Sequence, residues 1–597
     1  MNLLSLVRDE GFAPIDAYLS DATSTSTTST DLSNTDGILA SQLQRHWRSL
    51  YGDSHDALLC AFVSKLGQWR PQMQRVRADP ERDAYRTAVV YGLYVDLFGG
   101  SDFDAASERL DHIASLGCTC LWLLPVLASP MLDAGFDISD YLSVRAELGG
   151  NDAFDRFLTA AHARGMSVIF DVALNHCSSQ HRWFLDGARP DSPFHDFFHW
   201  SADASAYSGA RIIFRGIEES NWTLLPSTGQ FYFHRFFACQ PDLNYANPAV
   251  LLTMTCVFLH WAARGVDGFR LDAVPCVWKQ EGTSCESMPQ VHSIVKFLRA
   301  AVDSFRPGVF LLCEACQQPQ DLVAYFGEDG GDDGGDECHA AYHFALMPSI
   351  FLCLARQQAA PVVEQLNALP ADVRGQWFTF LRVHDELTLE MAPENMRSEL
   401  FAHYCRDPSW DFRNGIGVSA RLADLLANDH RRILLAFSIE LTLLASTPLI
   451  LYGDEFAKTN DVAFFEAERA RTGINDTRYL VRGRIDWHET QRILANAHCT
   501  GARVFDGLRS MLRVRQERAA LFGCGRVDLL AQHASVLAYV RGGSVLVIHN
   551  LQLSDTVADV PRAFVGGKSL LDAREPIGAH IRLEPSEFVW IESASGL

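Results

Sequence analysis

The sequence predicts an α/β protein built around a parallel (β/α)8 barrel, the TIM-barrel fold. Between residues 88 and 455, apolar runs with strand character alternate with segments of helical periodicity. A doubly wound parallel sheet is the competing architecture, but no glycine-rich phosphate turn follows the first run. The expected barrel strands are Ala88–Phe98, Cys118–Val126, Ser167–His176, Val266–Val274, Val309–Cys316, Ala340–Phe344, Trp377–Asp385 and Ser446–Glu455.

The segment before the barrel divides into two parts. The chain has 597 residues, more than one hydrophobic core usually holds, so several domains are expected. A Ser/Thr/Asp run without apolar period follows residue 22, and we expect residues 1–37 to be a disordered, low-complexity N-terminus. Apolar residues then recur at helical spacing, for example at Leu43, Trp47 and Leu50, which predicts a helical N-terminal domain over residues 38–84.

The rest of the chain divides into the barrel, an insertion and a C-terminal domain. We assign residues 85–176 and 249–522 to the barrel. Residues 177–248, rich in aromatic residues and histidine, interrupt it after the third strand and predict a lobe over the barrel mouth. Short alternating runs separated by Gly, Pro and Asp predict a C-terminal antiparallel β-sandwich over residues 523–597.

The composition of the chain restricts the kinds of molecule that it can bind. Lys and Arg total 51 against 73 Asp and Glu, a formal net charge of −22, which repels nucleic acid and anionic membranes and suits a neutral substrate. The 15 cysteines are irregularly spaced, as in reduced intracellular proteins. Met1–Ser20 lacks a secretory signal pattern, and no uncharged apolar stretch reaches the ~18 residues of a membrane span. We therefore expect a soluble cytoplasmic protein with no nucleic-acid or membrane partner.

Charged and polar residues stand near the ends of four predicted barrel strands. Catalytic groups of parallel barrels lie at the C-terminal strand ends, and buried charges are costly unless they are paired or functional. A single buried Asp could be a structural ion pair, but four strands ending in this way favour an active site. The residues are Asp171, Asn175 and His176 on the third strand, Arg270 and Asp272 on the fourth, Glu314 on the fifth, and His384 and Asp385 on the seventh.

The spacing suggests chemistry on a glycosidic bond. Arg270 and Asp272 are two residues apart and face the same side of a strand, so the arginine can keep Asp272 ionised as a nucleophile. Glu314 follows an apolar strand, where desolvation should raise its pKa and suit it to general acid/base catalysis. Retaining glycoside hydrolysis needs this pair of carboxyl groups. Asp385 would stabilise positive charge on the sugar ring.

These segments resemble glycoside hydrolase family 13, the α-amylase family. The match comprises Asp171-Val-Ala-Leu-Asn-His176, Gly268-Phe-Arg-Leu-Asp272, Glu314 and His384-Asp385, in the order and spacing of the family's conserved segments. Gln240-Pro-Asp-Leu-Asn244 resembles the segment of the branch that acts on short α-glucosides. The resemblance implies that residues 177–248 form a B domain and that the reaction proceeds by double displacement through a β-glucosyl-enzyme, without a cofactor.

The same resemblance assigns substrate-binding residues. His176 and His384 would bind the ring in the first sugar subsite, with Arg270 beside the nucleophile. Asp133, with Phe136 following, would close that subsite, and Arg478 would form a salt bridge to Asp133. A pocket blocked in this way implies action on one terminal glucose.

Resemblance to individual branches of the family differs along the chain. Glu219–Thr223, His234–Phe237, Asp336–His339 and His384–Met391 resemble trehalose synthases, which interconvert maltose and trehalose. The helical N-terminus and the stretch from Thr459 to Arg478 resemble amylosucrase and sucrose hydrolases. We expect a retaining transglucosidase on a small disaccharide, maltose or trehalose in the first place. Cleavage of sucrose is the alternative, and a non-catalytic sugar-binding homologue is a third possibility that the intact carboxylates argue against. The helical domain offers a surface for a homo-oligomer.

One position departs from the trehalose synthase pattern. Those enzymes carry a carboxylate near position 279 that helps to hold calcium, and here the residue is Lys279. An ammonium near Asp242 and Asn175 would replace the charge of the ion, and too few oxygen ligands would remain for Ca²⁺. A solvent-facing lysine is the alternative. Either way, we expect no required metal.

Overall fold

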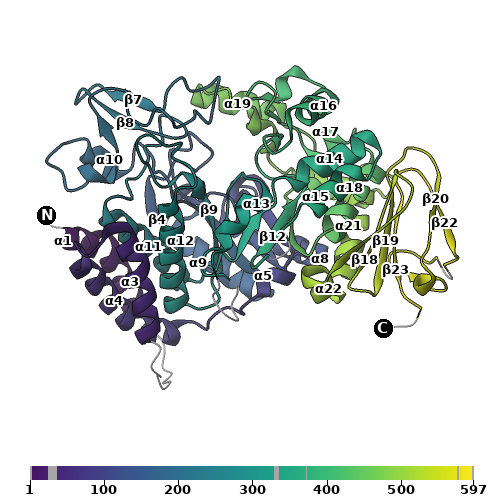
Figure 1. Cartoon of the computed structure of the whole chain (residues 1–597), viewed down its shortest axis with the longest axis horizontal. Helices are drawn as coiled ribbons and strands as arrows, with labels where there is room; N and C mark the ends of the chain where they lie inside the picture. The colour runs from purple at the N-terminus through teal and green to yellow at the C-terminus, as the bar shows by residue number, and fades with distance from the viewer. Residues whose placement is uncertain (1–2, 24–35, 329–334, 371–372, 575–576, 595–597) are drawn as a thin grey trace.

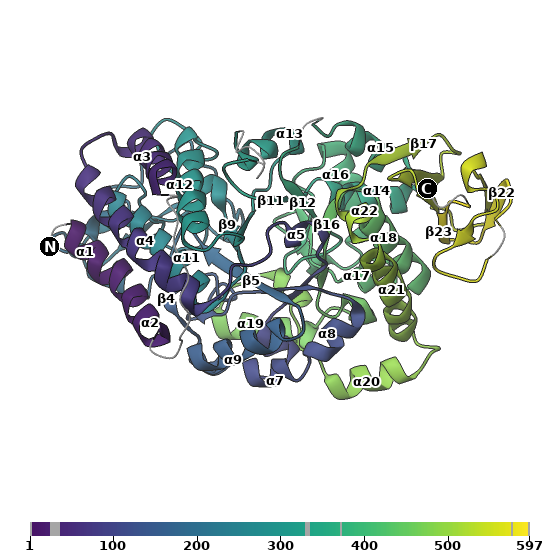
Figure 2. The same ribbon diagram turned by 90° about the horizontal axis from the view of Figure 1, so that it is seen from below.

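The computed structural model describes residues 3–23, 36–328, 335–370, 373–574 and 577–594. It is elongated, with the N-terminal helices at one end of the long axis and the C-terminal strands at the other (Figure 1). The barrel lies between them, and the view from below in Figure 2 shows the same order along the long axis.

Eight parallel strands close into the predicted barrel, in the order β1-β16-β12-β11-β10-β9-β5-β2. Each strand falls within or overlaps one of the eight expected runs, so the fold class is confirmed. Each strand is shorter than the run in which it was expected. The strands are β1 Val90–Leu93, β2 Cys120–Leu123, β5 Ser167–Ala173, β9 Gly268–Asp272, β10 Phe310–Cys313, β11 Ala340–Tyr342, β12 Gln376–Phe380 and β16 Ser446–Leu451.

The first expected strand is too long. It was predicted to extend to Phe98, but Val95–Phe98 forms a short helix, α6, whose Val95, Leu97 and Phe98 are buried. An apolar run of this length fits a strand or a buried helical turn equally well, and packing decides between them.

Helices surround the barrel. None of those in the described residues is long and apolar enough to cross a membrane. The principal ones are α7 Phe103–Ser107, α8 Leu110–Leu116, α9 Gly150–His162, α11 Pro248–Arg264, α12 Pro289–Phe305, α13 Pro319–Leu322, α14 Leu346–Arg356, α15 Ala360–Asn367, α16 Glu394–Tyr404, α17 Leu422–Leu425, α18 His430–Thr442, α19 Val462–Thr472, α20 Trp487–Ala495, α21 Thr500–Glu517 and α22 Ala519–Cys524.

The N-terminal segment is helical, and the expectation of disorder throughout residues 1–37 is wrong for residues 3–23. These residues form α1 Leu3–Val7, a π-helix over Arg8–Phe12 and α2 Ala13–Thr23. Ile15 and Leu19, four apart on one helical face, are fully buried in the main core. The rest of the Ser/Thr run, residues 24–35, lies outside the described residues. The predicted helical domain follows as α3 Asp36–Tyr51, α4 Asp56–Val76 and α5 Ala84–Thr87.

Residues 177–248 form the inserted lobe, which stands above the barrel in Figure 1. It contains α10 Arg182–Gly187 and a three-stranded antiparallel sheet in the order β6-β8-β7, made by Trp200–Ser201, Gln230–Phe233 and Trp222–Leu225. A second small sheet, β13-β15-β14, comes from the loop after β12 and is made by Leu387–Thr388, Gly417–Val418 and Asp411–Phe412. The antiparallel pair β3 Leu127–Ala128 and β4 Asp140–Val144 follows β2.

The C-terminal domain has the predicted antiparallel strands. Two sheets, β17-β18-β19-β23-β21 and β20-β22, share their own hydrophobic core, which includes Val536, Leu546 and Leu583. The strands are β17 Val527–Leu530, β18 Val536–Arg541, β19 Val545–Asn550, β20 Thr556–Asp559, β21 Lys568–Ser569, β22 His580–Leu583 and β23 Phe588–Glu592.

Candidate active site

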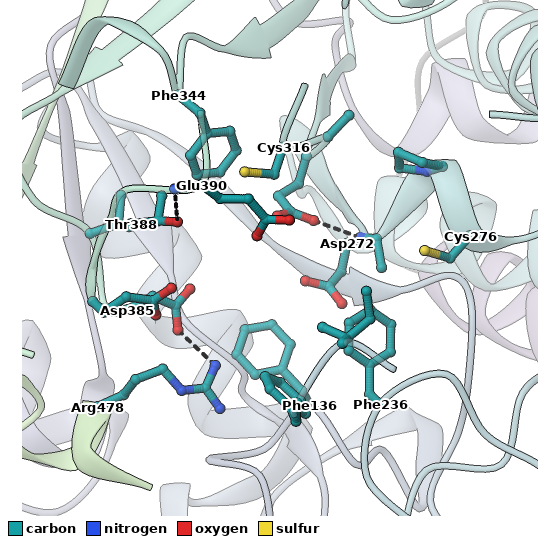
Figure 3. A pocket seen from close by; sticks show the side chains of 18 of the residues that line it. Phe136, Phe236, Asp272, Cys276, Cys316, Phe344, Asp385, Thr388, Glu390 and Arg478 are labelled. Carbon is teal, nitrogen blue, oxygen red and sulfur yellow. Dashed lines mark hydrogen bonds and ion pairs between the residues drawn. The ribbon is translucent and has the colours of Figure 1, made fainter. Parts of the chain in front are cut away.

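One pocket at the C-terminal ends of the barrel strands is lined by all nine residues that the sequence predicted for the site. They come from six separate segments, and Figure 3 shows the acidic side chains converging on the same space. The nine are Asp133, Phe136, His176, Arg270, Asp272, Glu314, His384, Asp385 and Arg478.

Asp272 ends strand β9 and is held by the arginine two residues before it. Arg270 Nη1 donates to Asp272 Oδ1 at 2.8 Å and to Asp171 Oδ1 at 2.5 Å. The Arg270 guanidinium also lies over the rings of Trp122 and Phe136, at 5.5 and 5.7 Å from their centroids. Because these contacts fix the guanidinium, it can orient the Asp272 carboxylate as a nucleophile.

Glu314 is hydrogen-bonded to the residue that follows Asp272. Its Oε2 accepts a 2.8 Å hydrogen bond from the backbone N–H of Ala273, the residue after Asp272. Ala273 has φ 53°, a left-handed conformation that costs a β-carbon residue about 1 kcal/mol and is concentrated at functional sites. Burial raises the pKa of Glu314 to about 7, the Arg270 charge opposes the rise, and the Asp272 charge adds to it. A carboxyl that keeps its proton near neutral pH is suited to act as a general acid.

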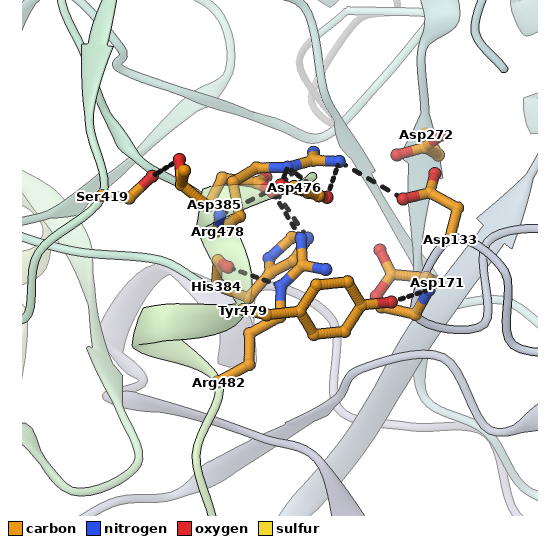
Figure 4. A network of polar contacts seen from close by, with 12 residues as sticks. Asp133, Asp171, Asp272, His384, Asp385, Ser419, Asp476, Arg478, Tyr479 and Arg482 are labelled. Atoms are coloured by element: carbon orange, nitrogen blue, oxygen red, sulfur yellow. Dashed lines mark hydrogen bonds and ion pairs between the residues drawn. The ribbon is translucent and has the colours of Figure 1, made fainter. Parts of the chain in front are cut away.

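Asp385 is held between two arginines, as Figure 4 shows. Its Oδ1 accepts hydrogen bonds from Arg478 Nη1 at 3.1 Å and Arg482 Nη2 at 2.9 Å. Burial opposes ionisation of Asp385, but the adjacent His384 and the two guanidinium groups outweigh it and hold its pKa well below the usual range. Arg478 Nη2 also lies 3.3 Å from Asp133 Oδ1, so the predicted salt bridge between these two residues is confirmed.

The predicted ring-binding residues surround the same end of the pocket. Phe136 stacks on His384 with a centroid separation of 5.3 Å and an interplanar angle of 20°. The Gln240 amide nitrogen lies 3.0 Å from Asp133 Oδ2 and 3.2 Å from His176 Nε2. The amide therefore links the two sides of a closed subsite.

Comparison with known proteins identifies the family. Residues 63–387 match the alpha amylase catalytic domain. The chain belongs to the α-amylase family. It is 41% identical over 481 residues to the trehalose synthase/amylase TreS of Mycolicibacterium smegmatis, covering 76% of this chain and 80% of that protein. It is 38% identical to the trehalose synthase of a Pimelobacter species, covering 79% and 87%. The trehalulose synthase MutB of Pseudomonas mesoacidophila has the same fold, with a TM-score of 0.66 at 22% identity, over 86% of this chain and all of that one.

Sequence reasoning missed an ion-pair network at the mouth of this α-amylase-family pocket. Arg211 of the B domain pairs with Glu286, from the loop after β9, at 2.8 Å and also with Glu390, from the loop after β12. Arg235 pairs with the same Glu286, and Arg413 lies 3.4 Å from Glu390. The B domain is thus joined to two barrel loops across the opening. No motif signals such a network, because its members are far apart in sequence.

Arg482 and Glu386 were also missed. Arg482 donates to Asp385 and, at 2.9 Å, to the His384 carbonyl oxygen. Glu386 lines the pocket, and burial together with the Asp385 charge raises its pKa to about 7. Glu386 follows His384-Asp385 directly, a signal that could have placed it in the site.

Lys279 occupies the position where trehalose synthases are expected to hold calcium. Its Nζ lies 2.7 Å from Asp242 Oδ2 and 2.6 Å from Asn175 Oδ1, and the side chains of Lys279 and Asp242 are fully buried. The solvent-facing alternative is wrong, and the predicted ion pair is confirmed. An ammonium at this point supplies the positive charge that the carboxylate and amide oxygens need.

Proposed function

We propose that this enzyme interconverts maltose and trehalose by transferring a glucosyl unit within one bound disaccharide. The observation that supports the substrate class most strongly is the 37–41% identity, over 76–80% of the chain, to proteins named trehalose synthase. The described residues give that reaction a closed first subsite and a pocket mouth bridged by ion pairs.

In the first step, the Asp272 carboxylate attacks C1 of the terminal glucose while Glu314 protonates the departing glycosidic oxygen. Arg270 orients the nucleophile. Asp385, kept ionised by Arg478 and Arg482, hydrogen-bonds to the ring hydroxyls and stabilises the positive charge of the oxocarbenium-like transition state. Asp133 and Arg478 close the far end, which supports release of a single glucosyl unit.

In the second step, the released glucose rotates in the outer part of the pocket and presents its anomeric hydroxyl to the glucosyl-enzyme. Glu314, now ionised, removes the proton from that hydroxyl, its oxygen bonds to C1 of the glucosyl unit, and the bond from C1 to Asp272 breaks, which returns the Asp272 carboxylate. Isomerisation requires that glucose remains and that water stays out, so a closed mouth matters as much as the carboxylates. The ion pairs of Arg211 supply such a closure.

Sucrose cleavage with the same machinery is the second candidate, favoured by the amylosucrase-like N-terminal helices and the stretch that holds Arg478. The deciding experiment incubates the purified enzyme separately with maltose, sucrose and trehalose, without added calcium, and resolves the products by chromatography. Trehalose from maltose, with the reverse reaction present, supports the proposal. Fructose from sucrose with maltose untouched would refute it.

A further inference from the structure

The segment that carries His176 into the pocket is held through its backbone. Residues 173–176 run from the end of strand β5 to the B domain, and each of their carbonyl oxygens lies within hydrogen-bond distance of a donor. The Tyr141 hydroxyl, with its one hydrogen, lies 2.6 Å from the His176 oxygen and 2.9 Å from the Ala173 oxygen. The Tyr245 hydroxyl donates to Leu174 at 2.7 Å, and the Leu243 amide donates to Asn175 at 2.9 Å.

Tyr141 is connected to the N-terminal helices through Trp183. Its ring stacks on Trp183 of the B domain, with a centroid separation of 5.6 Å and an interplanar angle of 24°. The Trp183 indole donates a 2.9 Å hydrogen bond to Oε2 of Glu10, which also pairs with Arg182. The Glu10 side chain is only 7% exposed. A contact path therefore runs from the π-helix at the N-terminus to the His176 carbonyl.

Tyr245 is hydrogen-bonded to a different part of the N-terminal helices. The Tyr51 hydroxyl, at the end of α3, donates to the Tyr245 carbonyl oxygen at 2.8 Å. The Tyr51 ring packs edge-on against Trp47, with a centroid separation of 4.7 Å. Two contact paths thus reach the same four-residue junction. One runs from the π-helix through Trp183 and Tyr141, and the other runs from α3 through Tyr245.

We propose that Glu10 and Tyr51 are positioning residues for the reaction, through which the helical N-terminal segment fixes the junction of barrel and B domain. This inference rests on the proposed function in that it takes the enzyme to bind a terminal glucosyl unit against His176. The B domain also brings Arg211, Phe214 and Phe236 to the pocket. A looser junction moves both the subsite and the mouth, so it slows formation of the glucosyl-enzyme and lets water compete with the acceptor glucose.

The chain contains a matched control. Asp16 accepts a 2.8 Å hydrogen bond from the Trp69 indole and pairs with Lys65 at 2.6 Å. This trio repeats the acid, indole and cation arrangement of Glu10, but all three members lie within the N-terminal helices. Asp16→Ala therefore reports what loss of stability in those helices alone does to catalysis.

The test measures two quantities with 4-nitrophenyl α-glucoside and added glucose. Nitrophenol counts every glucosyl-enzyme formed, and disaccharide counts those captured by glucose. For Glu10→Ala we expect kcat/KM to fall about tenfold, since small displacements far from the chemistry slow it strongly, and the share lost to water to rise about twofold. Tyr51→Phe should act in the same direction.

Glu10→Gln should lie within about twofold of the wild type, because the amide oxygen still accepts from the Trp183 indole. Arg182, whose side chain is 66% exposed, stays hydrated when the charge of its partner is removed. Asp16→Ala should stay within about twofold in both quantities. Equal effects of Glu10→Ala and Asp16→Ala, or a wild-type partition in Glu10→Ala, would overturn the inference.

The assay separates this inference from the proposed function. The nitrophenyl substrate requires only formation of the glucosyl-enzyme on Asp272, so the comparison of variants holds even when maltose yields no trehalose. Failure of isomerisation with intact variant effects would refute only the proposed function. Isomerisation with no variant effect would refute only the inference.

Discussion

The ion pair of Lys279 and Asp242 gives the sharpest test of how this chain stabilises its B domain. Lys279→Met removes the cation and leaves the Asp242 carboxylate buried without a counter-charge. Removing one partner of a buried pair costs about 3–5 kcal/mol. At roughly 2 °C per kcal/mol for a large cooperative unit, the thermal midpoint should fall by about 6–10 °C.

Two variants make the result interpretable. Lys568→Met removes an exposed lysine that lies 3.9 Å from Glu592, so it should lower the midpoint by less than about 2 °C. Lys279→Met combined with Asp242→Asn removes both buried charges, and we expect it to recover most of the loss. Calorimetry with and without EDTA is the assay. Since the ammonium already supplies the charge, EDTA should change neither the wild-type midpoint nor the activity. A Lys279→Met variant as stable as the wild type, or a wild-type midpoint lowered by EDTA, would refute this reasoning.

Three further predictions concern the reaction. Asp272→Asn should reduce turnover at least about 10⁴-fold because it removes the nucleophile; an unchanged circular dichroism spectrum is the control, and retained activity would contradict the mechanism. Glu314 must be protonated to act as an acid, so kcat/KM for maltose should fall tenfold per unit as the pH rises above about 7. With 4-nitrophenyl α-glucoside, whose leaving group needs no proton, the wild-type enzyme should lose that limb; a limb that persists with this substrate would assign it to another group. Arg211→Ala should raise the ratio of free glucose to trehalose formed from maltose by about twofold or more, because it opens the mouth. The control is Arg215→Ala, at an exposed arginine four residues further on. Equal ratios of glucose to trehalose in Arg211→Ala and Arg215→Ala would argue against closure of the mouth by Arg211.

The barrel and the reacting carboxylates were predictable because both follow from local rules. Apolar runs of strand length alternate with helical periods, and polar residues at strand ends face the barrel mouth. Arg270 and Asp272 share a face by the two-residue period alone.

The residues that sequence reasoning missed depend on tertiary placement. Arg482 and Arg211 lie outside the barrel strands, and a long side chain in a loop can reach many partners. The N-terminal helices are a different case. Ile15 and Leu19 carried a readable four-residue period, but the composition of the following Ser/Thr run dominated the interpretation.

The three carboxyl groups that act in the proposed mechanism differ in whether a guanidinium group contacts them. Asp272 accepts from Arg270, and Asp385 accepts from Arg478 and Arg482, which help to hold the pKa of Asp385 below its usual range. Among the described residues, Glu314 accepts its hydrogen bond from a backbone amide and none from an arginine. Asp272, Asp385 and Glu314 therefore have different surroundings within one pocket. These surroundings fit the proposed division of roles, in which Asp272 bonds to C1, Asp385 stabilises the developing positive charge, and Glu314 gives up a proton and takes it back.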